Sequence, residues 1–179
     1  MLQKSSILQT AEYFFAYPSK EHYLMDISRN IGLAHTSTKK NLKKLVKLGM
    51  IVEYAEKKGG RLFPIYKANL NGKMFKRYKL IYNLSSILES SLIDFIEEAL
   101  APKSIVLFGS YSRGEDVENS DIDIFVECKE NELNLEKFEK KLMRKIELHF
   151  NEKFASYSKE LKNNIMNGMV LSGFLEGYK

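Results

Sequence analysis

The 179-residue chain has few of the residues that build disulfide frameworks, zinc clusters or disordered tails. Its single cysteine, Cys128, excludes an internal disulfide, and its three histidines, His22, His35 and His149, are too scattered to predict a zinc cluster. Only three prolines argue against extended disorder. No apolar run approaches the length of about 18 residues that spans a membrane, and the first residues lack the apolar core of a signal peptide. The sequence therefore predicts a cytoplasmic protein with no membrane partner.

Charge divides the chain into two halves. Residues 1–80 contain 16 Lys and Arg against 5 Asp and Glu, which gives +11, and residues 81–179 contain 12 against 18, which gives −6. Their sum is the net charge of +5. A basic half attracts phosphate backbones, whereas an acidic half is expected around divalent cations. The length allows two small domains, so each half is expected to fold as one.

The most informative stretch runs from Gly109 to Glu127 and reads GSYSRGEDVENSDIDIFVE. It follows the apolar run from Ser104 to Phe108, which predicts a buried strand. Because side chains alternate along a strand, Asp121 and Asp123 are expected to project together from the next strand. Two adjacent carboxylates repel each other unless a cation lies between them, and such oxygen ligands suit Mg²⁺. A magnesium site is therefore predicted at Asp121 and Asp123.

The turn before this strand predicts a phosphate site. Gly109 allows backbone and ligand to come close, and backbone amides could hold phosphate oxygens together with the Ser110 hydroxyl. Arg113 adds a charged fork. Alone, the alternating Asp-Ile-Asp-Ile strand would be typical of a solvated sheet edge. The glycine turn after a buried strand favours a nucleotide site instead. A calcium loop is excluded because Ile122 and Ile124 stand where its ligands would be needed.

These residues resemble the minimal nucleotidyltransferases of the DNA polymerase beta superfamily. The family pattern is an apolar strand, glycine followed by serine or glycine, a short gap, and then acid, apolar, acid, apolar on the next strand. The matching positions are Phe108, Gly109, Ser110, Asp121, Ile122, Asp123 and Ile124, and Ser112, Arg113, Gly114 and Ser120 match the usual filling. The resemblance covers residues 87–174 and implies an α/β (α+β) fold with a small mixed sheet.

The resemblance also implies the chemistry. Two Mg²⁺ ions would assist transfer of a nucleoside monophosphate, AMP from ATP, to an acceptor hydroxyl, and a helical toxin protein is one candidate acceptor, which would make this chain an antitoxin. A third carboxylate is expected on a later strand, and Glu147 in KIELHF is the candidate. The family more often has aspartate there, so Glu147 is a metal ligand, a general base or an exposed strand residue. A helix over 131–143 is predicted before it.

In the basic half, apolar spacing predicts three helices and a hairpin. Ile7, Ala11, Phe14 and Phe15 fit the first helix, and Tyr23, Leu24, Ile27 and Ile31 fit the second. In the third helix Thr36 or Ser37 is the expected cap, Leu42, Leu45, Val46 and Leu48 form the expected buried stripe, and Gly49 ends the helix. A hairpin with a Gly59-Gly60 turn follows.

Residues 31–51 resemble the winged helix domains of bacterial and archaeal transcriptional regulators. By this analogy the third helix would face a major groove and the wing would meet phosphates of double-stranded DNA. The expected DNA-binding residues are His35, Thr36, Ser37, Thr38, Lys39, Lys40, Asn41, Lys43, Lys57, Lys58 and Arg61. Winged helices also serve as protein docking modules, and lysine stripes are often solvated surface, so both alternatives stay open.

The domain boundaries follow from these motifs. We expect a winged helix-turn-helix domain over 1–72, a linker helix over 73–86 and a nucleotidyltransferase domain over 87–179. Helical spacing of apolar residues is sustained over 73–101, which predicts one long or two consecutive helices that cover the sheet or pair two subunits as a homodimer. The alternative function is a DNA-binding regulator whose transferase-like domain senses nucleotide or mediates assembly.

Overall fold

The computed structural model describes residues 5–151 and 156–176 of the chain. The chain divides into two compact units, of which the first ends at Tyr82 and the second begins at Asn83. Helix α4 (Lys73–Ser90) runs through this boundary. Its first part packs into the core of the first unit through Phe75, and its last part packs into the core of the second through Ile87. Residues 73–86 are therefore part of one continuous helix that belongs to both units.

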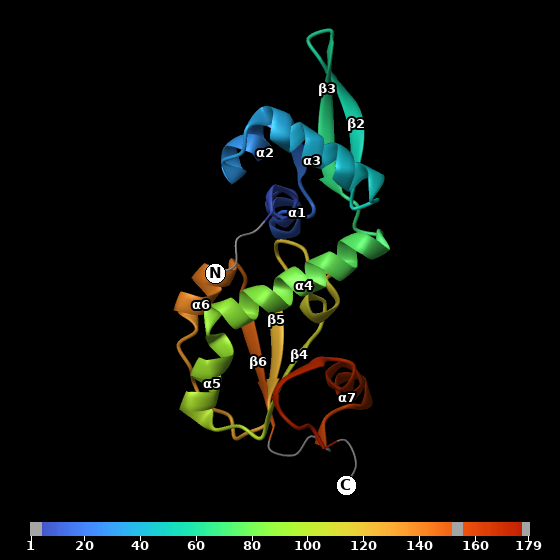
Figure 1. Cartoon of the computed structure of the whole chain (residues 1–179). Helices are drawn as coiled ribbons and strands as arrows, with labels where there is room; N and C mark the ends of the chain where they lie inside the picture. Colours follow the sequence, from blue (N-terminus) through green and yellow to red (C-terminus); the bar gives the residue numbers. More distant parts are fainter. Residues whose placement is uncertain (1–4, 152–155, 177–179) are drawn as a thin grey trace. The chain divides into compact units, whose positions relative to one another are not determined.

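The first unit combines three helices with a small antiparallel sheet. Its elements are α1 (Ser6–Ala16), β1 (Glu21–Tyr23), α2 (Leu24–Ile31), α3 (His35–Lys47), β2 (Ile51–Lys58) and β3 (Arg61–Ala68). The strand order is β1-β3-β2, and β2 and β3 form a hairpin that Figure 1 shows extending beyond the helices of this unit. Phe14, Phe15, Ile27 and Leu42 lie at the centre of its core.

The predicted helices and hairpin of this unit are present, with two differences at the ends of α3. Its N-cap is Ala34 rather than Thr36 or Ser37, so the helix begins before both hydroxyl residues. Leu48 was expected in the buried stripe but is 49% exposed, because it caps the last turn instead of continuing the apolar face. Gly49 then follows with φ 67°, a left-handed conformation that glycine adopts without strain.

The second unit is a four-stranded mixed sheet between helices. Its elements after α4 are α5 (Leu92–Leu100), β4 (Ser104–Phe108), the short 3₁₀ helix η1 (Tyr111–Arg113), β5 (Ile122–Val126), α6 (Glu136–Leu142), β6 (Ile146–Phe150), α7 (Lys159–Met166) and β7 (Met169–Gly173). The strand order is β6-β5-β4-β7; β4 pairs antiparallel with β5 and β7, and β5 pairs parallel with β6. This arrangement agrees with the small mixed sheet expected from the sequence.

The two faces of this sheet have different covers. Ile105, Leu107, Ile122 and Ile124 pack on one face with residues of α4, α5 and α6. The opposite face carries a smaller cluster, in which Val106, Phe108 and Phe125 pack with Ile165 of α7. Figure 1 shows α7 near β4, whereas α5 and α6 lie at the other side of the sheet. Because strand side chains alternate, the odd-numbered positions of β5 and β6 share the face of α7.

The helix predicted over 131–143 is shorter than expected. It begins at Glu136, where the Asn134 side chain accepts a hydrogen bond from the Glu136 backbone N–H at 3.1 Å. Such a side-chain acceptor favours a helix start at this point. Leu133 and Leu135 still pack against the core, although from non-helical backbone. In the part of the chain that the structure describes, no helix is both long and apolar enough to span a membrane.

Candidate functional site

Parallel pairing of β5 with β6 places two acidic residues side by side. The register aligns Asp123 with Glu147, although 23 residues separate them in the sequence. Their strand neighbours Ile122 and Ile124 point the other way into the buried core. Both carboxylates therefore project from the sheet face that α7 shares, and 26% of the Asp123 side chain and 59% of the Glu147 side chain are exposed.

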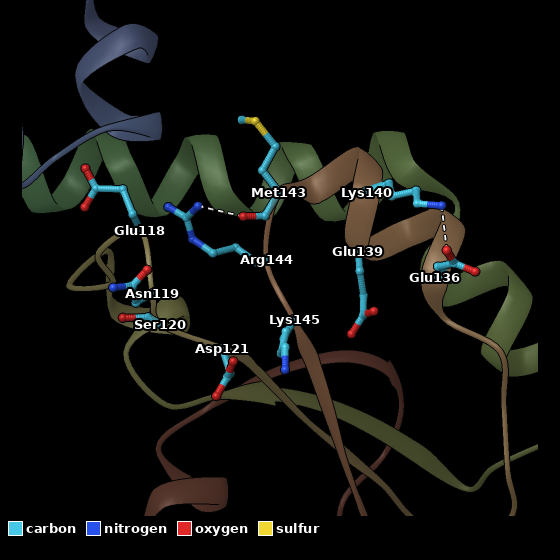
Figure 2. Close-up of a pocket in the computed structure, with 10 residues that line it drawn as sticks. All are labelled: Glu118, Asn119, Ser120, Asp121, Glu136, Glu139, Lys140, Met143, Arg144 and Lys145. Atoms are coloured by element: carbon cyan, nitrogen blue, oxygen red, sulfur yellow. Dashed lines mark hydrogen bonds and ion pairs between the residues drawn. The ribbon is translucent and has the colours of Figure 1, made fainter.

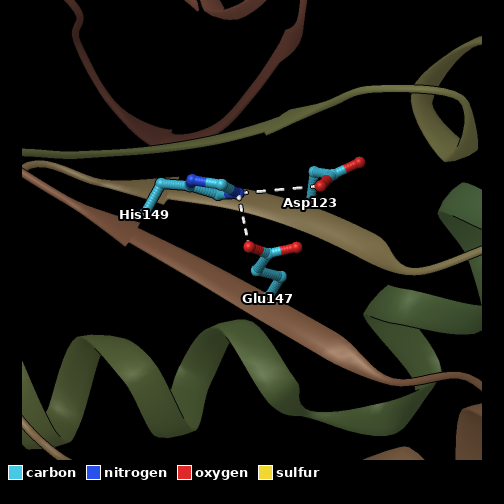
Figure 3. A group of neighbouring side chains, drawn as sticks. All are labelled: Asp123, Glu147 and His149. Atoms are coloured by element: carbon cyan, nitrogen blue, oxygen red, sulfur yellow. Dashed lines mark ion pairs between the residues drawn. The ribbon is translucent and has the colours of Figure 1, made fainter. Parts of the chain in front are cut away.

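His149 joins these carboxylates from the next position of β6 on the same face. Its Nε2 atom lies 3.6 Å from Oδ1 of Asp123 and 4.0 Å from Oε1 of Glu147. One potential ligand atom from each of the three side chains lies within 4.8 Å of the others. Figure 3 shows the imidazole pointing along the strands toward both carboxylates. The Phe108 ring contacts the imidazole edge-on, with 5.0 Å between ring centroids.

Gly109 brings the backbone directly against the Asp123 carboxylate. Its φ is 72°, and a Cβ atom at this position would lie 2.0 Å from Oδ2 of Asp123. No other residue type has both the conformational freedom and the missing side chain that this position requires. The turn closes through η1, where Ser112 Oγ donates to the Gly109 carbonyl at 2.9 Å and the Glu115 N–H donates to the Ser110 carbonyl at 3.0 Å.

A buried aspartate anchors the loop that follows this turn. Asp116 is fully buried; it accepts a hydrogen bond from Asn83 Nδ2 at 2.7 Å and lies 3.7 Å from a guanidinium nitrogen of Arg144. Asn83 Nδ2 also lies 2.9 Å from the Tyr111 carbonyl and donates to it. A buried carboxylate is tolerated when it is paired and hydrogen-bonded in this way. The loop between β4 and β5 is thereby fixed at its middle as well as at its ends.

The other residues predicted for the site lie outside the group of Asp123, Glu147 and His149. Asp121 is exposed and precedes the first residue of β5. Arg113 is also exposed, and its Nε pairs with Glu115 at 3.0 Å. Ser110 is half-buried and is the N-cap of η1. The structure thus unites Asp123 and Glu147 with Gly109, and leaves Asp121 at the edge.

Asp121 lines a cavity of about 720 Å³ beside the site. The cavity lies between the end of the β4–β5 loop and the segment from α6 to β6, and Figure 2 draws its lining. That lining is highly charged: it comprises Glu118, Asn119, Ser120, Asp121, Glu136, Glu139, Lys140, Met143, Arg144 and Lys145. Its acidic residues outnumber its basic ones, and two of the basic side chains are already paired: Lys140 with Glu136 at 2.6 Å and Arg144 with Asp116 at 3.7 Å.

The residues predicted to bind DNA divide into exposed and buried ones. The exposed members are His35, Thr36, Ser37, Lys39, Lys40, Lys43, Lys57, Lys58 and Arg61. Thr38 and Asn41 were expected to face a major groove, but both are buried. Asn41 Nδ2 instead donates to Thr10 Oγ1 at 3.1 Å and to Ser6 Oγ at 3.3 Å in α1. Asn41 therefore joins α3 to α1, whereas the Thr38 hydroxyl donates to the Ala34 carbonyl at 3.2 Å within its own helix; neither side chain reaches a ligand at the surface.

Sequence reasoning missed His149 by counting it among scattered histidines. The available signal was its spacing from Glu147, because residues two apart on a strand share a face. The parallel register that carries both residues to Asp123 could not be read from the local sequence.

The residues present fit a divalent metal ion. Two carboxylates supply the oxygen ligands that Mg²⁺ and similar cations use. The His149 Nε2 atom is buried and has no hydrogen-bond partner among the described residues, although it faces both carboxylates. A polar atom left in this way is consistent with a ligand that completes the site.

Comparisons with known proteins indicate the family to which this chain belongs. Residues 89–172 match the family described as "Nucleotidyltransferase domain". Two proteins of Methanocaldococcus jannaschii, both described as "Putative protein adenylyltransferase", are similar to this chain. One is 72% identical over 29 residues, which are 16% of this chain and 29% of that protein. The other is 43% identical over 63 residues, which are 35% of this chain and 72% of that protein.

A solved structure from Streptococcus mutans UA159 is also similar to this chain, with 23% sequence identity and a TM-score of 0.41. The alignment covers 55% of this chain and 94% of that one.

Proposed function

Because this chain belongs to the nucleotidyltransferase family, we propose that it transfers AMP from ATP to a hydroxyl group of an acceptor protein. The observation that carries the proposal is the close group formed by Gly109, Asp123 and Glu147, in which a glycine turn meets paired carboxylates. The description of both M. jannaschii relatives favours adenylyl transfer to a protein. A helical toxin is the acceptor suggested by the resemblance to minimal nucleotidyltransferases.

In the proposed reaction the acceptor hydroxyl loses its proton to solvent water, and its oxygen bonds to the α-phosphorus of ATP. The bond from that phosphorus to the bridging oxygen breaks, and pyrophosphate leaves with the bonding electrons. Mg²⁺, when bound, supplies charge neutralisation on the triphosphate and a lower pKa for the attacking hydroxyl. Asp123 and Glu147 would hold it, and Asp121 would extend the carboxylate set at the start of β5.

The protein's own groups would orient both substrates. The turn at Gly109 and Ser110 lets the triphosphate lie against backbone, and Arg113 is exposed beside the turn, where it could reach phosphate oxygens. The Asp116 anchor keeps this turn in place, which reduces the entropic cost of aligning the reactants. Glu147 is the most exposed of the three grouped side chains, a position that suits it to face the acceptor hydroxyl.

The test is transfer of label from ATP to protein in a cell extract with Mg²⁺. Addition of the chain should increase protein labelling from α-labelled ATP and leave labelling from γ-labelled ATP, which the kinases of the extract produce, unchanged. Asp123→Ala and Asp121→Ala should abolish the increase, whereas Asp94→Asn, an exposed aspartate of α5, should retain it. An increase from the γ-label on addition of the chain, or an α-label increase that survives both alanine substitutions, would refute the proposal.

We also propose that the first unit is a winged helix domain that binds double-stranded DNA. Three helices precede the β2–β3 hairpin, and α3 exposes Lys39, Lys40 and Lys43 along one helix. The hairpin adds Lys57, Lys58 and Arg61 at its turn. Five or six phosphate contacts would give a logarithmic salt slope of roughly −5. Pairing of two copies stays a prediction.

A further inference from the structure

His149 is placed by the fold to face the site rather than solvent. It follows Glu147 by two positions on β6, and β6 pairs in register with β5, so the imidazole lies on the face of Asp123. The Phe108 ring contacts it edge-on. Only 25% of the His149 side chain is exposed, and its Nε2 atom is buried.

The distances around Nε2 are too long for direct hydrogen bonds. Separations of 3.6 Å to Asp123 and 4.0 Å to Glu147 exceed the usual range of about 2.7 to 3.2 Å. Two ligands that lie about 2.1 Å from one ion, at angles of about 90° to 110°, are about 3.0 to 3.4 Å apart. Small rotations of the three side chains would bring them to this spacing. The group is therefore better suited to share a cation than to bond internally.

The donor set also bears on which cation binds. Carboxylate and water oxygens suit Mg²⁺, Ca²⁺ and Mn²⁺, whereas an imidazole nitrogen suits first-row transition-metal ions such as Fe²⁺ and Zn²⁺. Of the three ions that suit oxygen ligands, only Mn²⁺ is also a first-row transition-metal ion. A site of two carboxylates and one imidazole is therefore less well matched to Mg²⁺ than an all-carboxylate site.

We propose that His149 Nε2 is a ligand of the divalent cation held by Asp123 and Glu147, and that it gives this site a preference for Mn²⁺ over Mg²⁺. The proposal rests on the proposed function, because it concerns the cation of the same site. It adds a nitrogen ligand that the carboxylate motif does not contain. Without His149, the pair of carboxylates would bind through oxygen alone.

The first measurement is pulsed electron paramagnetic resonance of Mn²⁺ bound to the full chain without nucleotide. A directly bound imidazole gives modulation from ¹⁴N, which changes when the protein is labelled with ¹⁵N-histidine. His149→Gln should remove this modulation, whereas His35→Gln, an exposed histidine of α3, should retain it. Asp123→Asn should remove it together with the bound Mn²⁺, and this assigns the signal to the site even if the His149 variant does not fold.

The second measurement is the Kd of Mn²⁺ and of Mg²⁺ for the same proteins. His149→Gln should raise the Kd of Mn²⁺ about tenfold or more and change that of Mg²⁺ by less than about threefold. Absence of Mn²⁺ binding, absence of histidine coupling, coupling that survives in His149→Gln, or equal loss of both cations would overturn the inference. Equal loss would show that His149 only positions Asp123.

The activity assay is run in parallel so that the two proposals fail separately. Wild-type transfer of α-label with Mg²⁺, without histidine coupling to Mn²⁺, would overturn the nitrogen ligand and leave the proposed function standing. Histidine coupling to Mn²⁺ without any label transfer would overturn the proposed function and leave the nitrogen ligand standing.

Discussion

Gly109 and Asp123 are in such close contact that a single methyl group cannot fit between them. A Cβ atom on Gly109 would lie 2.0 Å from Oδ2 of Asp123 and 2.9 Å from its Cγ. Asp123 pairs with Phe108, the last residue of β4, so the glycine follows directly at the end of the strand pair. The turn and the carboxylate therefore form one structural unit, and a change in either should be felt by the other.

Gly109→Ala should lower activity far more than stability. The left-handed backbone costs about 1–2 kcal/mol for a non-glycine residue, and displacement of the Asp123 carboxylate should reduce label transfer about 100-fold. Gly60→Ala is the matched control, because Gly60 has φ 80° but a Cβ atom added to it would have no other atom within 4 Å. Thermal unfolding and label transfer would be measured on both variants. Equal activity of the two would contradict the role of this contact.

Asp123→Asn and Glu147→Gln should each weaken binding of the magnesium–ATP complex. Either change removes one carboxylate charge while it keeps the size of the side chain, so unfolding should change little. Isothermal titration calorimetry with ATP, with and without Mg²⁺, would measure the effect. Asp94→Asn serves as the control because it removes the same charge from an exposed position of the same unit. Unchanged affinity in both site variants would exclude this cation site.

Asp116→Asn should destabilise the second unit by about 3 kcal/mol, since it breaks a buried ion pair and leaves Arg144 with less compensation. Denaturant unfolding of the variant would measure the loss. Combining it with Asn83→Ala tests whether both belong to one network, because coupled residues give non-additive losses. Strictly additive losses would show that Asn83 and Asp116 act independently.

Replacement of Lys39, Lys40 and Lys43 by alanine should weaken binding to duplex DNA. The logarithm of the DNA-binding constant falls with the logarithm of salt concentration, with a slope of about −0.9 for each phosphate contact. Loss of three contacts should therefore make this slope less steep by about 3. The control removes Lys129, Lys137 and Lys140, which are exposed in the second unit and carry the same total charge. Fluorescence anisotropy at several salt concentrations would measure both. Equal slopes for the two variants would show that Lys39, Lys40 and Lys43 do not contact DNA phosphates.

Asn41→Ala should lower stability without a direct effect on DNA contacts. Asn41 is 5% exposed, and its side chain donates to Ser6 and to the buried Thr10, so the substitution leaves the Thr10 hydroxyl without this donor. A loss of about 1–3 kcal/mol is expected. Thermal unfolding would show this loss, and DNA affinity measured well below the transition should match the wild type. Reduced affinity at full folding would restore Asn41 to the DNA-binding surface.

Much of the fold follows from local patterns in the sequence. Alternation and the Gly59-Gly60 turn predicted the β2–β3 hairpin, and the apolar run before Gly109 predicted β4. The inward side of α3 was harder to predict, because Thr38 and Asn41 are polar residues on the buried face. The burial of Asn41 depends on hydrogen bonds to α1, which is distant in sequence.

The same contrast explains why the candidate site was predicted only in part: its local features could be read from the sequence, and its long-range contacts could not. The glycine turn and Asp123 lie in one short segment, and a resemblance to known enzymes indicated Glu147. The position of His149 depends on which residue of β6 pairs with which residue of β5, and long-range register has no local signature. Asp121 satisfies the sequence pattern, but it precedes the paired part of β5 and lines the neighbouring cavity.

The parallel pairing of β5 and β6 means that insertions are tolerated in the connection between the two strands but not within β6. The connection over 127–145 crosses from one strand to the next, and insertions in its loop portions before α6 should be absorbed there. A single residue inserted inside β6 between Ile146 and Glu147 would instead turn Glu147 and His149 toward the apolar core and bring Leu148 out in their place. A tag or a reporter can therefore be inserted into the loop between β5 and α6, but not into β6.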